Sequence, residues 1–423
     1  MKAVILAAGK GTRLSPLSDT RPKPMIPVGG KPILEHLLLS LKENGIRDVL
    51  LVVSYLGDLI KSYFEDGSHL GIRIKYVRQE KPLGTADALA ASTVSIGEDD
   101  FLVIYGDLFV SPDAISLLLE PEYTHENVLA VVEVDEVENY GVVHLTQNRV
   151  DGIVEKPIDA RRGRSLVNAG IYRMNKSVFD SLKQVSYSPR GDLELTDAIR
   201  MMIGSDRGVL AARIDSDDWM DIGRPWDLLQ ANERALKSLK RKIEGTVEEG
   251  AHVHGDVCLG RGARIRSGAY IEGPVFIGEG CDIGPNCFIR PCTSLDREVR
   301  IGTACEIKNS IILSRTHVGH LSYVGDSILG EGCNLGAGTM TANLRFDEAN
   351  VKVKVKSQLL DSGIRKFGVI MGDRVKTGVH VSTMPGVKIG PNSWIGPNLM
   401  LTRDVGPDML VFHRTRHRTR SIK

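Results

Sequence analysis

A strict repeat decides the fold of the second half of the chain. Residues 265–283 read IRSGAYIEGPVFIGEGCDI, in which every sixth residue is isoleucine. A period of six matches neither the 3.6 of a helix nor the alternation of a strand, so each hexad is expected to be a short strand plus a corner. The stretch predicts a parallel β-solenoid whose core positions are Leu259, Ile265, Ile271, Ile277, Ile283, Ile289, Leu295, Ile301, Ile307 and Leu313.

The repeat continues with one interruption. After Leu313 the register slips by one residue, and a segment from about Leu344 to Phe367 breaks the pattern. Glycine, proline and asparagine gather between the aliphatic positions, as a backbone that turns every few residues requires. The later core positions are expected at Val318, Val324, Leu329, Leu335, Met371, Thr377, Thr383, Ile389, Ile395 and Leu401.

This stretch resembles the hexapeptide-repeat acyltransferases. The resemblance implies a left-handed parallel β-helix with three hexads per coil, assembled as a homotrimer with active sites between subunits. The left hand follows from the resemblance alone, because parallel crossovers are normally right-handed. A trimerising stalk without chemistry is the alternative, since solenoids are often scaffolds.

Length and composition set the remaining bounds. The chain of 423 residues exceeds the usual size of one core, which predicts two domains. Its formal charge of +1 gives no reason to expect nucleic acid as a partner. Neither a signal peptide nor a membrane span is expected, so the predicted location is cytoplasmic. All six cysteines fall in the second half without a CxxC pair, which argues against zinc and favours reduced core thiols.

Strands and helices alternate in the first half. Met1–Leu6, Val49–Val53, Ile72–Val77 and Phe101–Tyr105 read as buried strands. Helices are expected between and after them, at Pro32–Glu43, Asp58–Phe64, Thr85–Ser92 and Pro112–Leu119. Such alternation predicts a doubly wound, Rossmann-like α/β sheet, where ligands gather outside the carboxyl ends of the strands.

The first loop, Leu6–Lys23, is the expected nucleotide site. Gly9 and Gly11 let backbone N–H groups approach phosphate oxygens, and Arg13 and Lys23 add charged donors. Neither a Walker loop nor a dinucleotide fingerprint fits, because Ser or Thr does not follow a Gly-Lys pair and Leu14 stands where a third glycine is needed. The stretch instead resembles the G-x-G-T-R-L-x-P-L signature of sugar-1-phosphate nucleotidylyltransferases, with its downstream Pro-Lys.

That resemblance implies roles for residues across the first half. Lys23 and Arg13 would act in catalysis, and Mg²⁺ would be held by Asp107, in Tyr-Gly-Asp, and Asp221, in Trp-Met-Asp-Ile-Gly. The sugar phosphate would contact Glu155, Lys156, Gly141 and Asn168. The nucleotide would contact Leu6, Ala7, Ala8, Gly9, Gly11, Thr12, Gln79, Gly84, Thr85 and Asp107. A sugar 1-phosphate is already ionised at neutral pH, so its attack on the α-phosphorus needs positioning and electrostatics but no general base.

Within the solenoid, polar residues interrupt the aliphatic rhythm at His317–Asp326. The segment resembles the G-H-L-x-Y-x-G-D site of the bifunctional glucosamine-1-phosphate acetyltransferase and N-acetylglucosamine-1-phosphate uridylyltransferase family, in its archaeal form. The resemblance covers essentially the whole chain and implies that His320 is the base and Asn343 orients the acetyl group. It also implies a sugar-phosphate set of Arg290, Lys308, Tyr323, Asn334 and Lys352, and an acetyl-CoA set of Ala337, Asn343, Pro397 and Arg414.

Two departures leave the sugar open. Leu344 stands where bacterial relatives follow the asparagine with tyrosine, and Lys352, Lys354 and Lys356 alternate as in a strand. Those lysines are typical either of a sugar site or of a charged edge that discourages sheet pairing. Glucosamine and galactosamine 1-phosphate both fit the sequence.

The sequence thus predicts a bifunctional enzyme of UDP-N-acetylglucosamine synthesis. It would use acetyl-CoA, UTP or dTTP, and Mg²⁺. A monofunctional glucose-1-phosphate nucleotidylyltransferase with a trimerising β-helix, and a catalytically dead scaffold subunit, are the alternatives. A helix over Pro225–Arg241 is expected to lead out of the first domain. The predicted boundaries are residues 1–235 for the nucleotidylyltransferase domain, 236–245 for a helical linker, 246–405 for the β-helix and 406–423 for a basic tail.

Overall fold

The computed structural model describes residues 1–157, 163–204, 208–413 and 420. The chain forms two compact units. The first contains Met1–Lys10, Arg21–Ile26 and Pro32–Ile222, and the second contains Gly11–Thr20, Pro27–Lys31 and Gly223–Lys423. The predicted nucleotide loop, Leu6–Lys23, is therefore divided between the two units.

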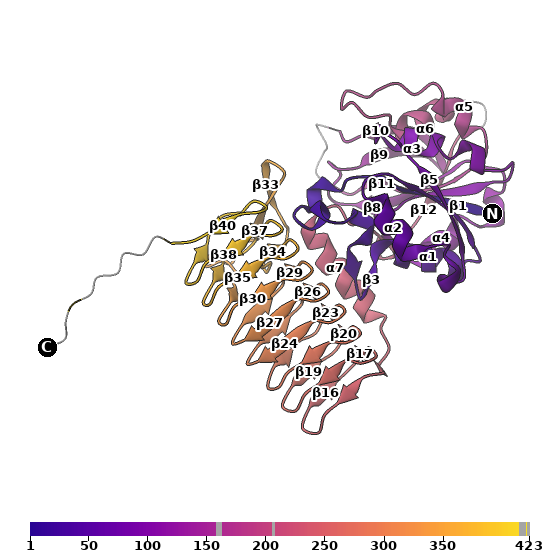
Figure 1. Cartoon of the computed structure of the whole chain (residues 1–423). Coiled ribbons are helices and arrows are strands. Elements are labelled where there is room, and N and C mark those ends of the chain that lie inside the picture. The colour runs from indigo at the N-terminus through magenta and orange to yellow at the C-terminus, as the bar shows by residue number, and fades with distance from the viewer. Residues whose placement is uncertain (158–162, 205–207, 414–419, 421–423) are drawn as a thin grey trace. The chain divides into compact units, whose positions relative to one another are not determined.

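The first unit is built on one mixed sheet (Figure 1). Four parallel strands stand at one side, and β11 joins them to the rest by running antiparallel to both β6 and β8. The strand order is β5 (Arg73–Arg78), β4 (Asp48–Val53), β1 (Lys2–Ala7), β6 (Phe101–Tyr105), β11 (Ser165–Met174), β8 (Val128–Val134), β12 (Leu210–Arg213), β10 (Arg149–Glu155) and β9 (Gly141–Thr146).

Helices cover both faces of this sheet, because alternate strand residues feed two separate cores. One core packs α1 (Ile33–Glu43), α2 (Gly57–Phe64) and α4 (Pro112–Leu117). The other packs α3 (Thr85–Ala90), α5 (Val178–Leu182) and α6 (Leu195–Ile203). The predicted doubly wound α/β fold is confirmed. The four predicted strands and four predicted helices differ from the observed ones by at most two residues at either end.

A short ribbon lies next to the carboxyl end of β6. There β7 (Leu108–Val110) pairs antiparallel with β13 (Trp219–Asp221), and Asp221 stands opposite Leu108. This pairing brings Asp221 beside Asp107, which directly precedes β7.

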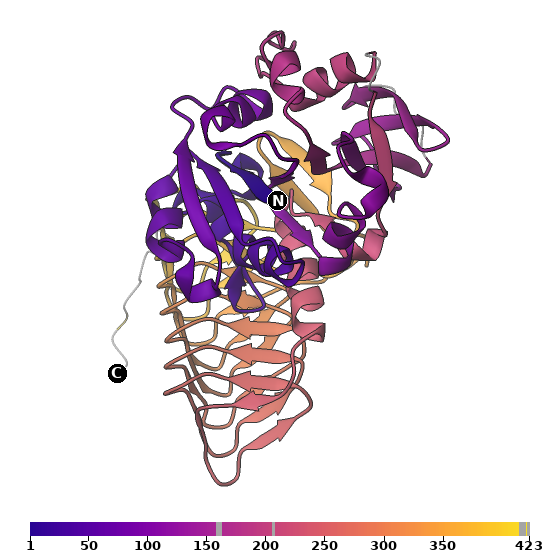
Figure 2. The same cartoon turned by 90° about the vertical axis from the view of Figure 1, so that its right-hand side faces the viewer.

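The second unit is a parallel β-helix, whose stacked coils form three parallel sheets (Figures 1 and 2). The first sheet contains β14 (Lys242–Ile243), β17 (Val257–Leu259), β20 (Val275–Ile277), β23 (Thr293–Leu295), β26 (Ile311–Ile312), β29 (Ile328–Leu329), β34 (Ile370–Met371) and β37 (Lys388–Ile389). The second contains β15 (Thr246–Val247), β18 (Arg264–Ile265), β21 (Asp282–Ile283), β24 (Arg300–Thr303), β27 (His317–His320), β30 (Asn334–Leu335), β35 (Lys376–Thr377), β38 (Trp394–Ile395) and β40 (Leu410–Val411). The third contains β16 (His252–His254), β19 (Tyr270–Glu272), β22 (Phe288–Ile289), β25 (Glu306–Lys308), β28 (Tyr323–Gly325), β31 (Met340–Thr341), β36 (Ser382–Thr383) and β39 (Met400–Leu401).

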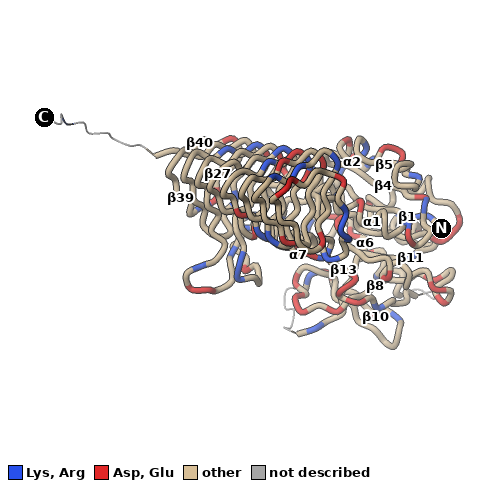
Figure 3. The backbone as a smooth tube through the Cα atoms, turned by 90° about the horizontal axis from the view of Figure 1, so that it is seen from below, with Lys and Arg blue, Asp and Glu red and all other residues tan. Residues whose placement is uncertain are grey.

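The hexad prediction is confirmed for most of the core. Ile265 pairs with Ile283 and Ile271 with Ile289, each 18 residues along, so three hexads make one coil, as in a left-handed β-helix. These aliphatic side chains are fully buried. Basic and acidic residues lie close together along the coils (Figure 3), and Arg297 pairs with Glu279 one coil away.

One predicted core position was wrong. Ile312, and not Leu313, pairs with Leu295 below and with Leu329 above. The step from Ile307 to Ile312 spans five residues because one corner is a residue shorter, and the step from Val324 to Leu329 is shortened in the same way. Leu313 is buried but follows the strand rather than filling the repeat position.

The predicted interruption is a hairpin inserted between β31 and β34. Its strands β32 (Lys352–Val355) and β33 (Gln358–Asp361) pair antiparallel, with Val353 and Val355 buried and the lysines exposed. Leu329 then pairs with Met371, which resumes the stack in register.

The helix that precedes the solenoid, α7 (Pro225–Lys237), ends four residues before the predicted Arg241. It buries Trp226, Leu229 and Leu236 as expected. The side chain of Asn232 accepts a hydrogen bond from Ser294 Oγ at 2.6 Å and donates one to the Cys292 carbonyl at 2.9 Å, which fixes the helix on the coils.

The six cysteines are free thiols, and four of them are buried. Burial raises the pKa of Cys281 and of Cys287 to about 12, so both stay protonated at neutral pH. In the part of the chain that the structure describes, no helix has the length and apolar character to cross a membrane.

Candidate functional sites

Two carboxylates and one ammonium converge at the carboxyl end of β6. The Lys23 Nζ lies 2.5 Å from Asp107 Oδ2 and 3.7 Å from Asp221 Oδ1. The side chain of Lys23 is 6% exposed, whereas those of Asp107 and Asp221 are 32% and 16% exposed. The predicted catalytic lysine and the two predicted metal ligands therefore form one cluster that solvent reaches from the aspartate side.

The donor set of this cluster suits Mg²⁺. Magnesium in nucleotide enzymes is typically held by one or two carboxylates together with substrate phosphates. Asp107 supplies one carboxylate from the turn before β7, and Asp221 supplies the other from the end of β13. Among the described residues there is no group of three or more His, Cys, Asp or Glu side chains arranged for a metal ion.

The predicted base-reading loop is fixed by its backbone. Gln79 Nε2 donates to the Gly84 carbonyl at 3.1 Å and to Asp87 Oδ2 at 2.7 Å. Gly84 has φ of 128°, and a Cβ there would stand 2.3 Å from the Leu193 carbonyl oxygen, so only glycine fits. Thr85 Oγ1 accepts a hydrogen bond from the Leu195 N–H at 2.9 Å. The loop is thus tied to residues 193–195.

The predicted sugar residues meet between β9, β10 and β11. Gly141 pairs with Glu155, and a Cβ on Gly141 would lie 2.9 Å from the Glu155 carboxylate. Lys156 Nζ stands 3.6 Å from Glu155 Oε1. Asn168 donates to Tyr172 Oη at 2.8 Å and accepts from the Gly170 N–H at 2.9 Å. Burial raises the pKa of Glu155, against the opposing effect of Lys156.

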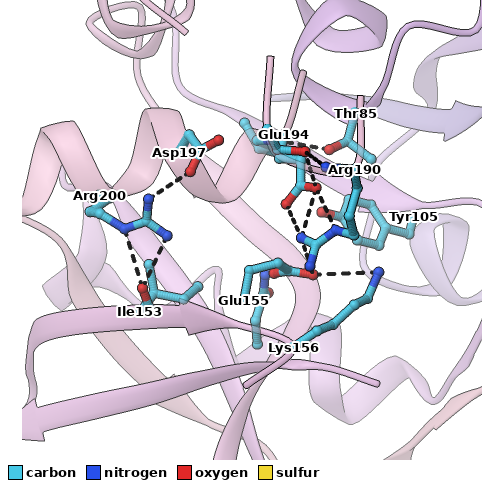
Figure 4. A network of polar contacts seen from close by, with 12 residues as sticks. Thr85, Tyr105, Ile153, Glu155, Lys156, Arg190, Glu194, Asp197 and Arg200 are labelled. Atoms are coloured by element: carbon cyan, nitrogen blue, oxygen red, sulfur yellow. Dashed lines mark hydrogen bonds and ion pairs between the residues drawn. The ribbon is translucent and has the colours of Figure 1, made fainter. Parts of the chain in front are cut away.

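Two charged residues near Glu155, namely Arg190 and Glu194, were not predicted from the sequence. Arg190 binds Glu194 through Nε and Nη2, and its Nη2 also stands 3.9 Å from Glu155 Oε1 (Figure 4). Both belong to the segment that holds Gly84 and Thr85. Tyr105 was expected only as a strand end, yet its hydroxyl lies 3.0 Å from Tyr172 Oη, and burial raises the pKa of both phenols well above the usual range.

The remaining loop residues lie at the end of β1 and beyond it. Leu6 and Ala7 end the strand, and Ala8 is buried. A Cβ added to Gly9 would have no other atom within 4 Å. Gly11 takes φ of 62° and precedes a short 3₁₀ turn, Thr12–Leu14. This turn carries Arg13 and belongs to the second unit.

Four predicted acetyltransferase residues gather on the third sheet of the β-helix. Lys308 ends β25 and Tyr323 begins β28 on the next coil, while Arg290 follows β22 on the coil below. Asn343 Nδ2 donates to Tyr323 Oη at 3.1 Å. Burial raises the pKa of Tyr323, so its hydroxyl stays protonated at neutral pH. Arg290 pairs with Glu306 at 2.8 Å and lies 5.6 Å from the centre of the Phe288 ring.

The predicted base stands at the corner that leads into this sheet. His320 ends β27 and is exposed. Its carbonyl accepts from the Gly338 N–H, the Ala337 carbonyl accepts from the His380 N–H, and the Val379 carbonyl accepts from the Asn398 N–H. These bonds stack His320, Ala337, Val379 and Pro397 in one column on successive coils, which groups the predicted base with two predicted acetyl-CoA residues.

The other predicted residues lie apart from that column. Asn334 is exposed on β30 opposite His317. Lys352 is exposed at the start of β32, in the inserted hairpin. Arg414 lies outside the described residues.

Comparison with known proteins shows similarity along essentially the whole chain. The nucleotidyl transferase family matches residues 2–238, and the family described as GMPPB C-terminal domain matches residues 271–382. A "Bifunctional protein GlmU" from Methanococcus maripaludis is 45% identical over 98% of this chain and 98% of its own length. Another with that name, from Methanocaldococcus jannaschii, is 43% identical over the full length of both chains. A "Bifunctional sugar-1-phosphate nucleotidylyltransferase/acetyltransferase" from Sulfurisphaera tokodaii is 42% identical over 96% of this chain and 98% of its own.

The chain belongs to this family of bifunctional transferases. The nucleotidyl transferase match covers the first half of the chain. The nucleotidyl transferase match spans the Lys23, Asp107 and Asp221 cluster, and the full-length relatives also span the His320 column. The family resemblance found from the sequence motifs is confirmed.

Proposed function

We propose that this bifunctional transferase acetylates glucosamine 1-phosphate with acetyl-CoA and then transfers a uridylyl group from UTP to the product, releasing pyrophosphate. Galactosamine 1-phosphate and dTTP are the alternative sugar and nucleotide. The proposal includes Mg²⁺ as the metal, a homotrimer as the assembly and the cytoplasm as the location. It assigns the transfer of the nucleotide to residues 1–235, and acetyl transfer to residues 246–405. The predicted linker, residues 236–245, includes β14, and the predicted tail, residues 406–423, includes β40, so the stacked strands extend beyond both ends of the acetyl-transfer range.

The nucleotidyl half needs charge more than proton transfer. The phosphate oxygen of the sugar 1-phosphate attacks the α-phosphorus of the nucleotide, and the bond to pyrophosphate breaks. Lys23 is held by two carboxylates and so presents a fixed ammonium without reorganisation at the moment of reaction. Glu155 and Asn168 would accept and donate to sugar hydroxyls, while Lys156 would face the phosphate.

Asp107 and Asp221 would hold the metal together with phosphate oxygens of the nucleotide. A bound Mg²⁺ screens the repulsion between the two anionic substrates and stabilises the leaving pyrophosphate. The proximity of Lys23 to the same carboxylates supports this assignment, because it aims both of them at one point.

The acetyl half needs a base. The free amine of the sugar attacks the thioester carbonyl, and the ammonium formed must lose a proton before coenzyme A departs. His320 is exposed at the corner of the column with Ala337 and Pro397. Its imidazole would contact acetyl-CoA bound along this column. Arg290, Lys308 and Tyr323 on the adjacent sheet would bind the sugar phosphate, with Asn334 and Lys352 as further contacts, and Asn343 and Arg414 would contact the acetyl-CoA.

The observation that carries the proposal is that one chain contains both clusters and resembles bifunctional relatives along its full length. Mass spectrometry of products tests it. The four nucleoside triphosphates are combined with glucosamine, galactosamine and glucose 1-phosphates, with and without acetyl-CoA. We expect UDP-N-acetylglucosamine only when acetyl-CoA is present with glucosamine 1-phosphate and UTP. A product formed only from glucose 1-phosphate, without acetyl transfer, would favour the monofunctional alternative.

A further inference from the structure

Asp326 is a buried carboxylate on the β-helix to which none of the roles above is assigned. It follows β28 directly, takes φ of 49° and has a side chain that is 3% exposed. A buried carboxylate is costly unless donors surround it. Three side chains from different parts of the coil provide those donors.

The first two donors come from the coil below. Lys308 Nζ lies 3.0 Å from Asp326 Oδ2 and 3.3 Å from Oδ1, and Asn309 Nδ2 donates to Oδ1 at 2.8 Å. The Lys308 side chain is 20% exposed. Its ammonium therefore contacts Asp326 on the buried side and retains access to solvent.

The third donor comes from the segment after β31. Asn343 Nδ2 donates to Asp326 Oδ2 and to Tyr323 Oη. The Asp326 N–H in turn donates to the Lys308 carbonyl, and its carbonyl accepts from the Gly368 N–H. One carboxylate thus fixes the positions of Lys308 and Asn343. In the proposed function, Lys308 binds the sugar phosphate and Asn343 contacts the acetyl-CoA.

We propose that Asp326 is the positioning residue of the acetyltransferase site, aiming Lys308 at the sugar phosphate and Asn343 at the acetyl group. The inference rests on the proposed function of those two residues. Asp326 need not touch either substrate, because its oxygens are occupied by side chains of the protein. Its effect on the rate passes through the two residues that it holds.

A neighbouring ion pair offers a matched control. Arg290 and Glu306 also join a predicted phosphate-binding cation to a carboxylate on the next coil, at 2.8 Å. Their side chains are 39% and 37% exposed, whereas Asp326 is 3% exposed. Exposed pairs contribute little, so Glu306→Gln should alter either kinetic constant by less than about fivefold.

The test is a double-mutant cycle in the full-length enzyme. Asp326→Asn should raise the KM for glucosamine 1-phosphate and lower kcat for acetyl transfer, each by roughly ten- to a hundredfold, as the loss of a hydrogen bond to a charged group predicts. In the Lys308→Gln background, adding Asp326→Asn should leave KM unchanged, because Lys308 is already absent, while kcat should still fall through Asn343. A purely structural role would lower the melting temperature without this division between KM and kcat.

The outcomes are separable. If Asp326→Asn does not fold, Lys308→Gln with and without Asp326→Asn still gives the kcat comparison. In the single variant Asn309 and Asn343 still donate to Asp326, and the double variant buries no unpaired charge. Equal kcat and KM in those two variants would overturn the role of Asp326. Unchanged KM in Lys308→Gln alone would instead overturn the proposed sugar-phosphate site. Nucleotidyl transfer, measured on the same preparations with N-acetylglucosamine 1-phosphate, should remain at the wild-type rate.

Discussion

Replacement of Lys23 by methionine tests the electrostatic role of the Lys23, Asp107 and Asp221 cluster in nucleotidyl transfer. The substitution keeps most of the aliphatic stem but removes the ammonium that lies 2.5 Å from Asp107 and 3.7 Å from Asp221. Loss of a preorganised donor aimed at developing charge lowers rates by about 10²- to 10³-fold. We expect a loss of that size in kcat/KM for UTP, with acetyl transfer unchanged.

The cost in stability is expected to be moderate. Two carboxylates lose their shared counter-ion, but Asp107 is 32% exposed and can be hydrated, so the free energy of unfolding should fall by about 1–3 kcal/mol. Arg73→Gln is the control, because it breaks the exposed Asp48–Arg73 pair at the edge of the same sheet. It should change stability by less than about 1 kcal/mol and leave both activities intact.

Pyrophosphate release and thiol release from acetyl-CoA measure the two activities in parallel, and urea unfolding measures stability. A Lys23→Met enzyme that transfers uridylyl groups within about tenfold of the wild-type rate would refute the electrostatic role of Lys23. Equal loss of both activities would mean that the substitution disrupts the fold rather than the site.

Three further predictions use other parts of the chain. His320→Ala should lower acetyl transfer by roughly 10²- to 10⁴-fold, with uridylyl transfer to N-acetylglucosamine 1-phosphate retained. If this variant acetylates at the wild-type rate from about pH 6 to about pH 9, His320 is not the base. Burial raises the pKa of Glu155 above its ordinary 4.5, so binding of the sugar to the carboxylate should fall as pH decreases through that raised value. Because the folded state favours the protonated acid, stability should decrease as pH rises through the same range. Glu155→Gln should abolish both pH dependences. If sugar binding by this variant still weakens at low pH, another residue is responsible for that titration. Light scattering should give the mass of a trimer, and a monomer would contradict a site shared between subunits.

Much of the β-helix could be predicted because its periodicity is a property of the sequence itself. Each aliphatic residue at the repeat position pairs with its equivalent one coil along, as Ile265 and Ile283 do. The error at Leu313 arose because Ile311, Ile312 and Leu313 are consecutive aliphatic residues and the period of six points to the last of them. Only the pairing of Leu295 with Ile312 distinguishes them.

Contacts within the sites were harder to predict. Stacking places residues about 18 apart on neighbouring coils, so the pair Lys308–Asp326 follows from the repeat once its register is known. No such rule connects Glu155 with Arg190, which approach through an irregular segment after α5. Motifs identified Lys23, Asp107 and Asp221 separately, and only the pairing of β7 with β13 brings the two aspartates to one lysine.

Because the proposed function assigns the two reactions to separate parts of the chain, we expect the N-acetylglucosamine 1-phosphate formed at one site to be released before it binds at the other. Mixing Asp107→Asn with His320→Ala tests it directly, with glucosamine 1-phosphate, acetyl-CoA and UTP as substrates. Each variant alone should form almost no UDP-N-acetylglucosamine, because one lacks the carboxylate of the nucleotidyl cluster and the other the base of the acetyl site. The mixture should restore synthesis, with free N-acetylglucosamine 1-phosphate passing from one enzyme to the other. A mixture that stays inactive, while each variant retains its remaining half-reaction, would contradict that account.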